Sequence, residues 1–427
     1  MRQPPNHPGR SPRPSASAAL LLIVALLLPA PPRPSLAADV QGDAVGLVGQ
    51  LDDGTRPSAT VDPASLRLQE LRVRGRAVWA QTDVPAQRIE WAVAGWEVAD
   101  ALLTTHAGVG APREPMALYL FADSENFRRL TSQLTGLPLN AIRAFEGGRS
   151  FTAGARRGIY VNAAPLRSAA QAARVVAHEL VHLAERDALA TRTVPRWFSE
   201  GLAEYVAQFA MAHVDAHAAA ERRWRRAAVV ASALHLKLAI PLSALTTPQQ
   251  WNDQAAAGYD RVIYAEALQA IDWLVTLGGP GAAGRVLTEV ARGREFAPAL
   301  EAVTGIVLPT LDASADAALR ADLLPRYPVG IHVFEETLPP GARFQFAAVG
   351  LPPGEMLSRH FTRDDGYEAH DPGPPAPVGP TGAAFWTFQT RPDTIPAAWM
   401  VAVEGNQGTL LQHSFHVTAA SSAVSDP

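Results

Sequence analysis

The sequence predicts an α+β domain, mainly helical with a small sheet, followed by an all-β sandwich. Between residues 66 and 325, short apolar runs are joined by long stretches with apolar residues at helical spacing. After residue 329, short alternating runs separated by Pro and Gly turns replace them. A chain of 427 residues also favours more than one domain, and 48% hydrophobic with 18% charged residues is typical of a soluble globular protein.

The N-terminus has the features of a secretory signal. Basic residues without acids precede the apolar run 18–28, and residues 35–37 (SLA) form a small-x-small cleavage site. An uncleaved anchor is the alternative, but this run ends at Pro29 and is shorter than the roughly 20 residues that span a bilayer. We expect residues 1–37 to be a signal peptide and residues 38–65 a loose leader. The mature chain is then exported and has no membrane span.

Charge and cysteine content limit the possible functions. Removal of the four arginines in the signal changes the formal net charge from −4 to −8, and an acidic chain argues against nucleic acid as a partner. Because the chain contains no cysteine, disulfides, thiol catalysis and cysteine zinc sites are excluded. Any metal must therefore be held by histidine and carboxylate side chains. The composition indicates no oligomeric state.

The first helix and strands follow from local periodicity. Residues 88–106 have apolar side chains at helical spacing, and we expect Trp91, Val98, Ala99 and Leu102 to share one face. Two short apolar runs predict buried strands, MALYLF at 116–121 and GIYVN at 158–162.

The later helices are indicated by their start signals. Ser168 and Gln171 form a capping-box pattern, so a helix should begin at Ser168. A second should begin at Pro195, because proline is tolerated in a first helical turn. Further helices are expected at residues 259–277, 281–292 and 313–323.

The C-terminal region predicts a small β-sandwich over residues 329–419. Its expected strands are residues 343–349, 384–389, 399–403 and 413–417. Its histidines are His332, His360, His370, His413 and His416, and they have no metal-ligand spacing. The tail at residues 420–427 should be frayed.

The stretch AHELVHLAE carries an HExxH motif. His178 and His182 are four residues apart, so on a helix they project from one face and can bind one metal. Glu179 lies beside them, where a catalytic base would act on a metal-bound water. A surface helix with incidental histidines is the alternative. His213 and His217 share the spacing without the glutamate, and we interpret that pair as a solvated helix face.

A second motif, PRWFSEGLAEYV at residues 195–206, supplies what HExxH lacks. Glu200 would complete a His-His-Glu set, which leaves one position for water in a catalytic zinc site. Glu204, one helical turn further on, is expected to accept a hydrogen bond from a ligating histidine and orient it. An amphipathic helix with two exposed acids is the alternative.

Together, HELVH and WFSEGLAEY resemble the gluzincin metallopeptidases, in particular the bacterial peptidase MA-like group. The resemblance covers residues 116–318 and implies a zincin-like fold with one zinc per chain, bound by His178, His182 and Glu200. It also implies Glu179 as the base and Tyr264 as donor to the oxyanion. Tyr264 could instead be packed in the core, and Tyr259 competes for the role.

The resemblance further implies that an edge strand aligns an extended peptide, and residues 158–162 are the candidate for that strand. The predicted sandwich similarly resembles an accessory immunoglobulin-like domain.

The function that fits these motifs is zinc-dependent hydrolysis of peptide bonds in a peptide or protein substrate, with Glu179 as general base. Two alternatives stay open. One is a secreted or surface binding protein whose sandwich is the working part and whose zincin domain is degenerate. The other is an amide hydrolase that acts on something other than peptides.

Overall fold

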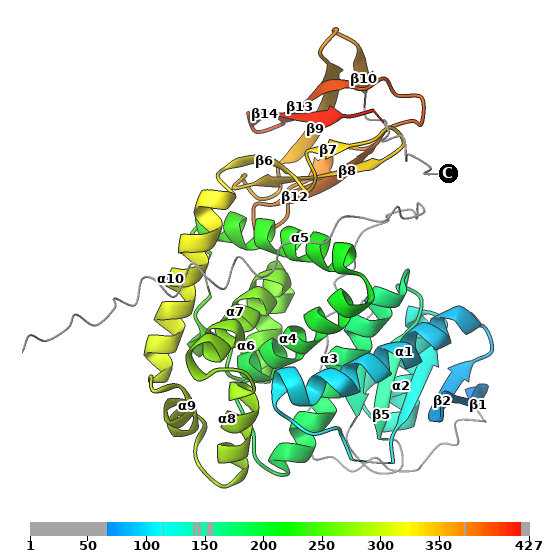
Figure 1. Ribbon diagram of the computed structural model, residues 1–427, viewed down its shortest axis with the longest axis vertical. Coiled ribbons are helices and arrows are strands. Elements are labelled where there is room, and N and C mark those ends of the chain that lie inside the picture. Colours follow the sequence, from blue (N-terminus) through cyan, green and yellow to red (C-terminus); the bar gives the residue numbers. More distant parts are fainter. Residues whose placement is uncertain are drawn as a thin grey trace, which may run out of the picture. The chain divides into compact units, whose positions relative to one another are not determined.

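The structure is a computed structural model that describes residues 66–419, apart from residues 114, 140–141, 143–146, 152–156, 239 and 371–372. Within this part of the chain the fold is mixed α+β, with helices and a small sheet up to Arg326 and a strand-rich region from Gly330 (Figure 1). The coarse fold class predicted from the sequence is therefore confirmed. The predicted signal peptide, leader and C-terminal tail lie outside the described residues.

The N-terminal sheet has the strand order β1-β2-β3-β5-β4. Its strands are β1 (Leu68–Val73), β2 (Arg76–Gln81), β3 (Ala117–Phe121), β4 (Gly148–Phe151) and β5 (Gly158–Asn162). Strands β1 and β2 form an antiparallel pair, β2, β3 and β5 run parallel, and β4 is antiparallel to β5. Strands β3 and β5 are those that the sequence predicts.

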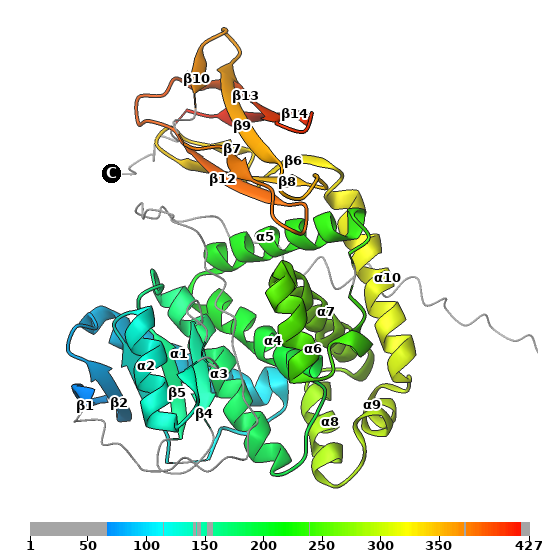
Figure 2. The same ribbon diagram turned by 180° about the vertical axis from the view of Figure 1, so that it is seen from behind.

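Alternate residues of the central strands face two helical layers. Leu118 and Leu120 belong to a core shared with α1 (Ala86–Leu102) and α3 (Ala169–Leu189). Tyr119 and Phe121 pack on the other side, against α2 (Ser124–Thr135). Helices α1 and α2 accordingly lie on opposite faces of the sheet (Figure 2).

The four residues of α1 expected on one face pack against the same core, but the most buried stripe of the helix lies beside them. Of the four predicted residues only Ala99 is buried, and the others are partly buried. A Cβ atom on Gly95 would lie 2.6 Å from Cα of Ala173, so the stripe with the smallest residues approaches α3 most closely. The predicted helix also ends early, because Leu103–Ala107 (η4) is a π-helix. The buried residues of α1 are Ile89, Ala92, Val93, Gly95, Trp96 and Ala99.

Helices α3 and α4 (Arg196–Val214) begin where the sequence predicts. The Ser168 hydroxyl accepts a hydrogen bond from the Gln171 backbone N–H (3.2 Å) and caps α3, and Pro195 is the N-cap residue of α4. The three later predictions correspond to α7 (Asp260–Gly278), α8 (Ala282–Ala291) and α10 (Leu308–Arg326). Also present, but not predicted, are α2, α5 (Ala216–His235), α6 (Pro248–Gln254) and α9 (Phe296–Thr304).

One prediction about histidines is wrong in part. His213 and His217 are both exposed, as expected. However, α4 ends at Val214 and α5 begins at Ala216, so the two histidines belong to different helices and share no helical face. Asp215 ends one helix and caps the next by accepting a hydrogen bond from the backbone N–H of Ala218 (2.9 Å).

The strand-rich region contains two sheets around one core. One sheet has the order β12-β8-β6, and the other has β10-β9-β13-β14-β7 with β11 paired to β9. Phe346 of β8 and Phe415 of β14 lie 5.4 Å apart between ring centroids, so the two sheets share buried aromatic side chains. The strands are β6 (Gly330–Val333), β7 (Thr337–Leu338), β8 (Arg343–Val349), β9 (Met356–Arg363), β10 (Glu368–His370), β11 (Ala376–Pro377), β12 (Ala384–Gln389), β13 (Ala397–Gly405) and β14 (Leu410–Val417).

Helix α5 contacts the strand-rich region. Nη2 of Arg225 donates to Oε1 of Gln345 (2.8 Å), and the Gly350 backbone N–H donates to Oγ of Ser232 (2.8 Å). Apolar residues of α5, α10 and β8 also form one buried cluster that includes Leu234. Helix α5 is therefore packed between the other helices and the strands.

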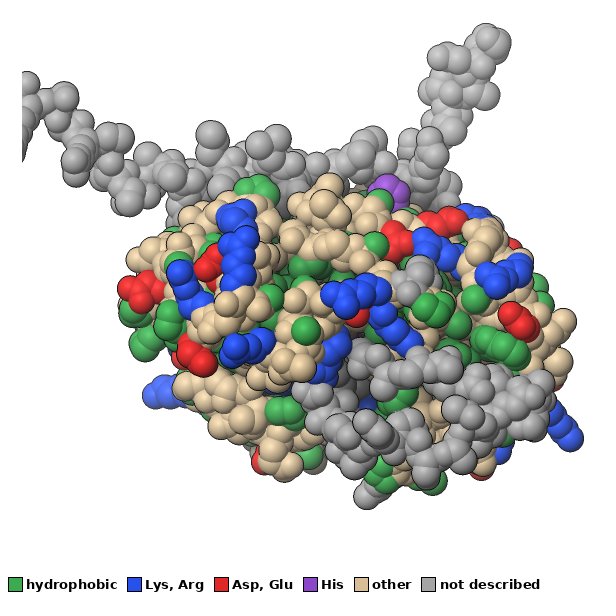
Figure 3. Space-filling model, turned by 90° about the horizontal axis from the view of Figure 1, so that it is seen from below, with side chains coloured by type: hydrophobic (Ala, Val, Ile, Leu, Met, Phe, Trp, Pro, Cys, Tyr) green, Lys and Arg blue, Asp and Glu red, His purple; other side chains and the backbone are tan. Residues whose placement is uncertain are grey.

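The described helices were compared with the length and hydropathy that a membrane span needs. No single described helix is long and apolar enough to cross a membrane, and only α9 with α10, bent by 63°, satisfies the length and composition criterion as a pair. On the face seen from below, Lys and Arg side chains lie across the middle and acidic side chains mainly toward the margin (Figure 3).

Candidate metal centre

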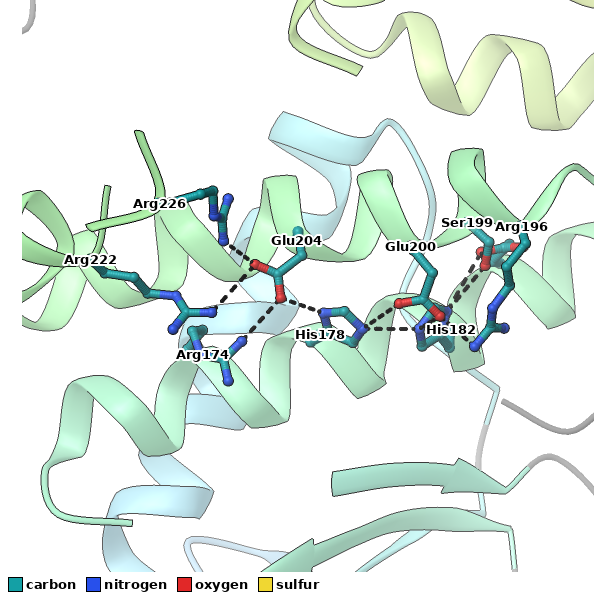
Figure 4. Close-up of polar contacts among 10 residues, drawn as sticks. Arg174, His178, His182, Arg196, Ser199, Glu200, Glu204, Arg222 and Arg226 are labelled. Atoms are coloured by element: carbon teal, nitrogen blue, oxygen red, sulfur yellow. Dashed lines mark hydrogen bonds and ion pairs between the residues drawn. The ribbon is translucent and has the colours of Figure 1, made fainter. Parts of the chain in front are cut away.

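The predicted ligands come together between α3 and α4. His178 and His182 lie one turn apart on α3, and their Nε2 atoms are 3.1 Å from each other. Glu200 of α4 faces both, with Oε2 3.2 Å from Nε2 of His178 and Oε1 3.7 Å from Nε2 of His182. Figure 4 shows the three side chains converging from the two helices. All three are completely buried.

The spacing fits a single small metal ion. Two ligand atoms bound to zinc at tetrahedral angles lie about 3.3 Å apart, given bond lengths of about 2.0–2.1 Å. The observed separations of 3.1, 3.2 and 3.7 Å bracket that value. Among the described residues, this is the group of three or more potential ligand side chains whose ligand atoms lie within 4.8 Å of one another. A buried His-His-Glu group that can bind a metal ion is therefore present.

The second nitrogen of His178 lies against a carboxylate, as predicted. Its Nδ1 is 3.2 Å from Oε1 of Glu204, one turn beyond Glu200 on α4. The same carboxylate contacts arginines from two helices, Arg174 of α3 at 3.0 Å and Arg226 of α5 at 2.5 Å. Arg222 lies further away, at 3.9 Å. Glu204 thus fixes the His178 ring and joins α3, α4 and α5.

His182 has a corresponding arrangement that the sequence analysis missed. Its Nδ1 is 3.2 Å from Oγ of Ser199, and Ser199 donates to Oε2 of Glu185 (2.7 Å). Both residues belong to the quoted motifs, since Glu185 ends AHELVHLAE and Ser199 precedes Glu200. The available signal was Glu185, because residues i and i+3 of a helix are neighbours. Each of the two histidines therefore lies against a carboxylate, His182 through the hydroxyl group of Ser199.

Burial and charge act in opposite directions on the ionisable groups of the site. Burial lowers the pKa of His178, but its contacts with Glu200 and Glu204 outweigh this and raise the pKa to about 9. Burial raises the pKa of Glu200, yet Arg196, His182 and His178 together lower it to about 2. Burial also opposes ionisation of Glu204, but the nearby arginines hold its pKa well below the usual range. Both carboxylates are therefore ionised at neutral pH, whereas His178 without a metal carries a proton that a metal ion would have to displace.

Glu179 lies against strand β4 of the sheet. It is completely buried, and a Cβ atom on Gly148 would lie 3.3 Å from its Oε1. Glycine at this position lets strand β4 lie directly against Glu179. The predicted base is thus covered by β4, while the histidines on either side of it face α4.

The predicted edge strand is wrong. Residues 158–162 form β5, which pairs with β3 on one side and β4 on the other, so its backbone has no edge for a peptide. Among the described strands the two edges of this sheet are β1 and β4 (Gly148–Phe151), and neither was predicted as a strand. The continuous apolar run Ile159–Val161 within β5 was the available signal, because strands buried on both faces have nearly continuous apolar runs.

The two candidate tyrosines have different surroundings. The ring of Tyr264 lies 6.2 Å from the ring of His178, edge to face, and 4.9 Å from that of Trp251. Tyr259 instead packs in an apolar cluster with Val262 and Ala383. Of the two, Tyr264 is therefore the one beside the metal-binding group, although its ring is also packed in the core.

Comparisons with known proteins give no family for the chain, because no family model and no curated protein matches it. Among solved structures it is similar to a superoxide reductase (neelaredoxin) from Ignicoccus hospitalis, with 10% identity and a TM-score of 0.17 over 24% of this chain and 89% of that chain. It is also similar to a lipoprotein from Bacteroides thetaiotaomicron, with 17% identity and a TM-score of 0.15 over 22% and 83%. Neither score supports an inference about fold or function.

Proposed function

We propose that this protein is an exported zinc-dependent metallopeptidase with a zincin-like catalytic domain. The observation that carries the proposal is the convergence of His178, His182 and Glu200 within 3.1–3.7 Å of one another, with Glu179 on the same helix as the histidines. Two imidazoles and one carboxylate are the donor set of many hydrolytic zinc sites. The HExxH and WFSEGLAEY motifs, which resemble the gluzincins, supply the same residues.

The proposed reaction is hydrolysis of a peptide bond. A zinc ion in such a site acidifies water and polarises a carbonyl group. Glu179 accepts a proton from the attacking water and passes it to the leaving amine, so that no net proton is consumed by the residue. Glu204 and the Ser199–Glu185 pair hold the two imidazole rings in place throughout. Tyr264 is the candidate donor to the oxygen that becomes negatively charged.

Strand β4 is the proposed binding edge for an extended substrate. Its partner on one side is β5, and among the described strands it is the end of the sheet nearest Glu179. A peptide paired with β4 would run past Glu179 and the ligands of α3, with its backbone fixed by the strand. The strand-rich C-terminal region would be an immunoglobulin-like accessory domain.

The proposal is tested by metal content and peptidase activity together. The full chain should bind one zinc per molecule and cleave a denatured protein substrate. The Glu179→Gln variant should keep the zinc and lose cleavage, because only the base is removed. Normal cleavage by this variant would refute the mechanism. Zinc binding by the wild type without cleavage of any protein or peptide would instead favour a binding protein with a degenerate site, or an amide hydrolase with a different substrate.

A further inference from the structure

Arg196 forms a buried ion pair with a proposed metal ligand. It lies one helical turn before Glu200 on α4, and its Nη2 contacts Oε1 of that carboxylate. The Arg196 side chain is 8% exposed and the Glu200 side chain is fully buried. Glu200 thus has a cation on one oxygen in addition to the two imidazoles that it faces.

The first turn of a helix is an unfavourable place for a buried cation, because the helix dipole is positive there. The arginine side chain is also not needed to complete that turn. The backbone N–H groups of Arg196 and Trp197 donate to the carbonyl oxygens of Thr246 (2.8 Å) and Leu245 (3.0 Å). The carboxylate of Glu200 is a partner whose charge offsets that of the guanidinium.

The two carboxylate oxygens of Glu200 have different contacts. Oε2 lies 3.2 Å from Nε2 of His178 and so belongs to the group of converging ligand atoms. Oε1 contacts the guanidinium of Arg196 and also lies 3.7 Å from Nε2 of His182. A guanidinium suits this task, because its planar, always charged donor group fixes a carboxylate oxygen in direction as well as in distance.

We propose that Arg196 is a positioning residue that makes Glu200 bind the metal through Oε2 alone. With Oε1 held by the guanidinium, the carboxylate cannot turn to bind through both oxygens. One coordination position then stays open for water, which a catalytic zinc site requires. This inference rests on the metal site of the proposed function and adds how one of its ligands is bound.

The test is the coordination number of the bound metal in the full chain. X-ray absorption at the zinc edge should give four ligands in the wild type, with one carboxylate oxygen and one water. In Arg196→Gln we expect five ligands and a zinc affinity about 10- to 100-fold lower, measured by competition with a chelator. With Co²⁺ in place of zinc, the visible absorption of the variant should weaken, as it does when four-coordinate cobalt becomes five-coordinate. Arg196→Lys, which keeps a charged donor, should recover part of the affinity.

Arg226→Gln is the matched control, because Arg226 pairs with Glu204, which is not a ligand. It should keep four-coordinate metal. The same coordination number in Arg196→Gln and Arg226→Gln, or an unchanged coordination number in the first, would overturn the proposal. So would a wild-type site in which Glu200 binds through both oxygens, a result that needs no variant to fold. A wild-type chain that binds no metal would refute the metal site itself.

Discussion

Glu266 gives a quantitative prediction about stability and pH. It lies on α7, two residues beyond Tyr264, and is 7% exposed. Oε1 accepts a hydrogen bond from the Ile240 backbone N–H (3.0 Å), while Oε2 is buried without a hydrogen-bond partner among the described residues. Burial, with smaller contributions from Asp312 and Asp316, raises the pKa of Glu266 to about 8, although the Ile240 hydrogen bond and Arg320 oppose this.

The direction of the effect follows from which state binds the proton. Between pH 4.5 and 8 the unfolded chain has released the proton of Glu266, whereas the folded chain retains it. The free energy of unfolding therefore falls by about 1.4 kcal/mol for each pH unit in this range. Below pH 4.5 the contribution is absent, and above pH 8 it is constant. The full loss is on the order of 5 kcal/mol, of which about 3 kcal/mol is already present at pH 7.

The perturbation that isolates this contribution is Glu266→Gln, which keeps an acceptor for Ile240 and cannot ionise. We expect the stability difference between variant and wild type to shift in favour of the variant by about 3 kcal/mol between pH 5 and pH 7.5. Any loss of stability that comes from placing the amide of Gln in this buried site is the same at both pH values, so it cancels in the comparison. Urea unfolding followed by circular dichroism measures it. A difference that changes by less than about 1 kcal/mol would refute the reasoning.

Two further predictions concern the helices around the metal-binding group. Glu204→Gln removes the charge that faces the arginines of α3 and α5, so it should destabilise the chain by about 3–5 kcal/mol in urea unfolding. It should also lower zinc affinity about 10- to 100-fold, and an unchanged affinity would contradict its role. Gly201→Ala should cost about 1–3 kcal/mol, because the new Cβ would lie 2.4 Å from the carbonyl oxygen of Ala267 on α7. An unchanged melting temperature would show that α4 and α7 need not approach this closely.

The fold could be predicted where local signals were strong. Helices α3 and α4 have a cap and a proline at their starts, and β8 and β12 have alternating aromatic residues. Helix α1 was predicted, and the four residues expected on one face do pack against one core, but the most buried stripe was not identified. The prediction started from the large side chain of Trp91. In the structure, the close approach of Gly95 to α3 determines which residues of α1 are fully buried. Strand β4, GRSF, has neither length nor alternation, and it is formed by pairing with β5.

The metal-binding group could be predicted further than its surroundings. Its members belong to residue pairs at i, i+4 spacing on two successive helices. This spacing can be read from the sequence without knowing the tertiary structure. The arginines around Glu204 come partly from α5, which had not been predicted as a helix, so their convergence depended on tertiary packing. The same holds for the edge strand. Pairing between distant segments determines which strand lies at the edge of a sheet. A prediction from the hydrophobicity of single segments therefore named β5 in place of β4.

The position of α5 has a practical consequence for fragments of the chain. One face of this helix supplies arginines to Glu204, and another buries Val230 and Leu234 against β8 and α10. A fragment ending near Tyr327 would leave that apolar face open to water and remove the hydrogen bonds to Gln345 and Gly350. We expect such a fragment to aggregate and to bind metal poorly, even though it contains every proposed ligand. We therefore expect that residues 66–326 need the strand-rich region to be expressed in folded form.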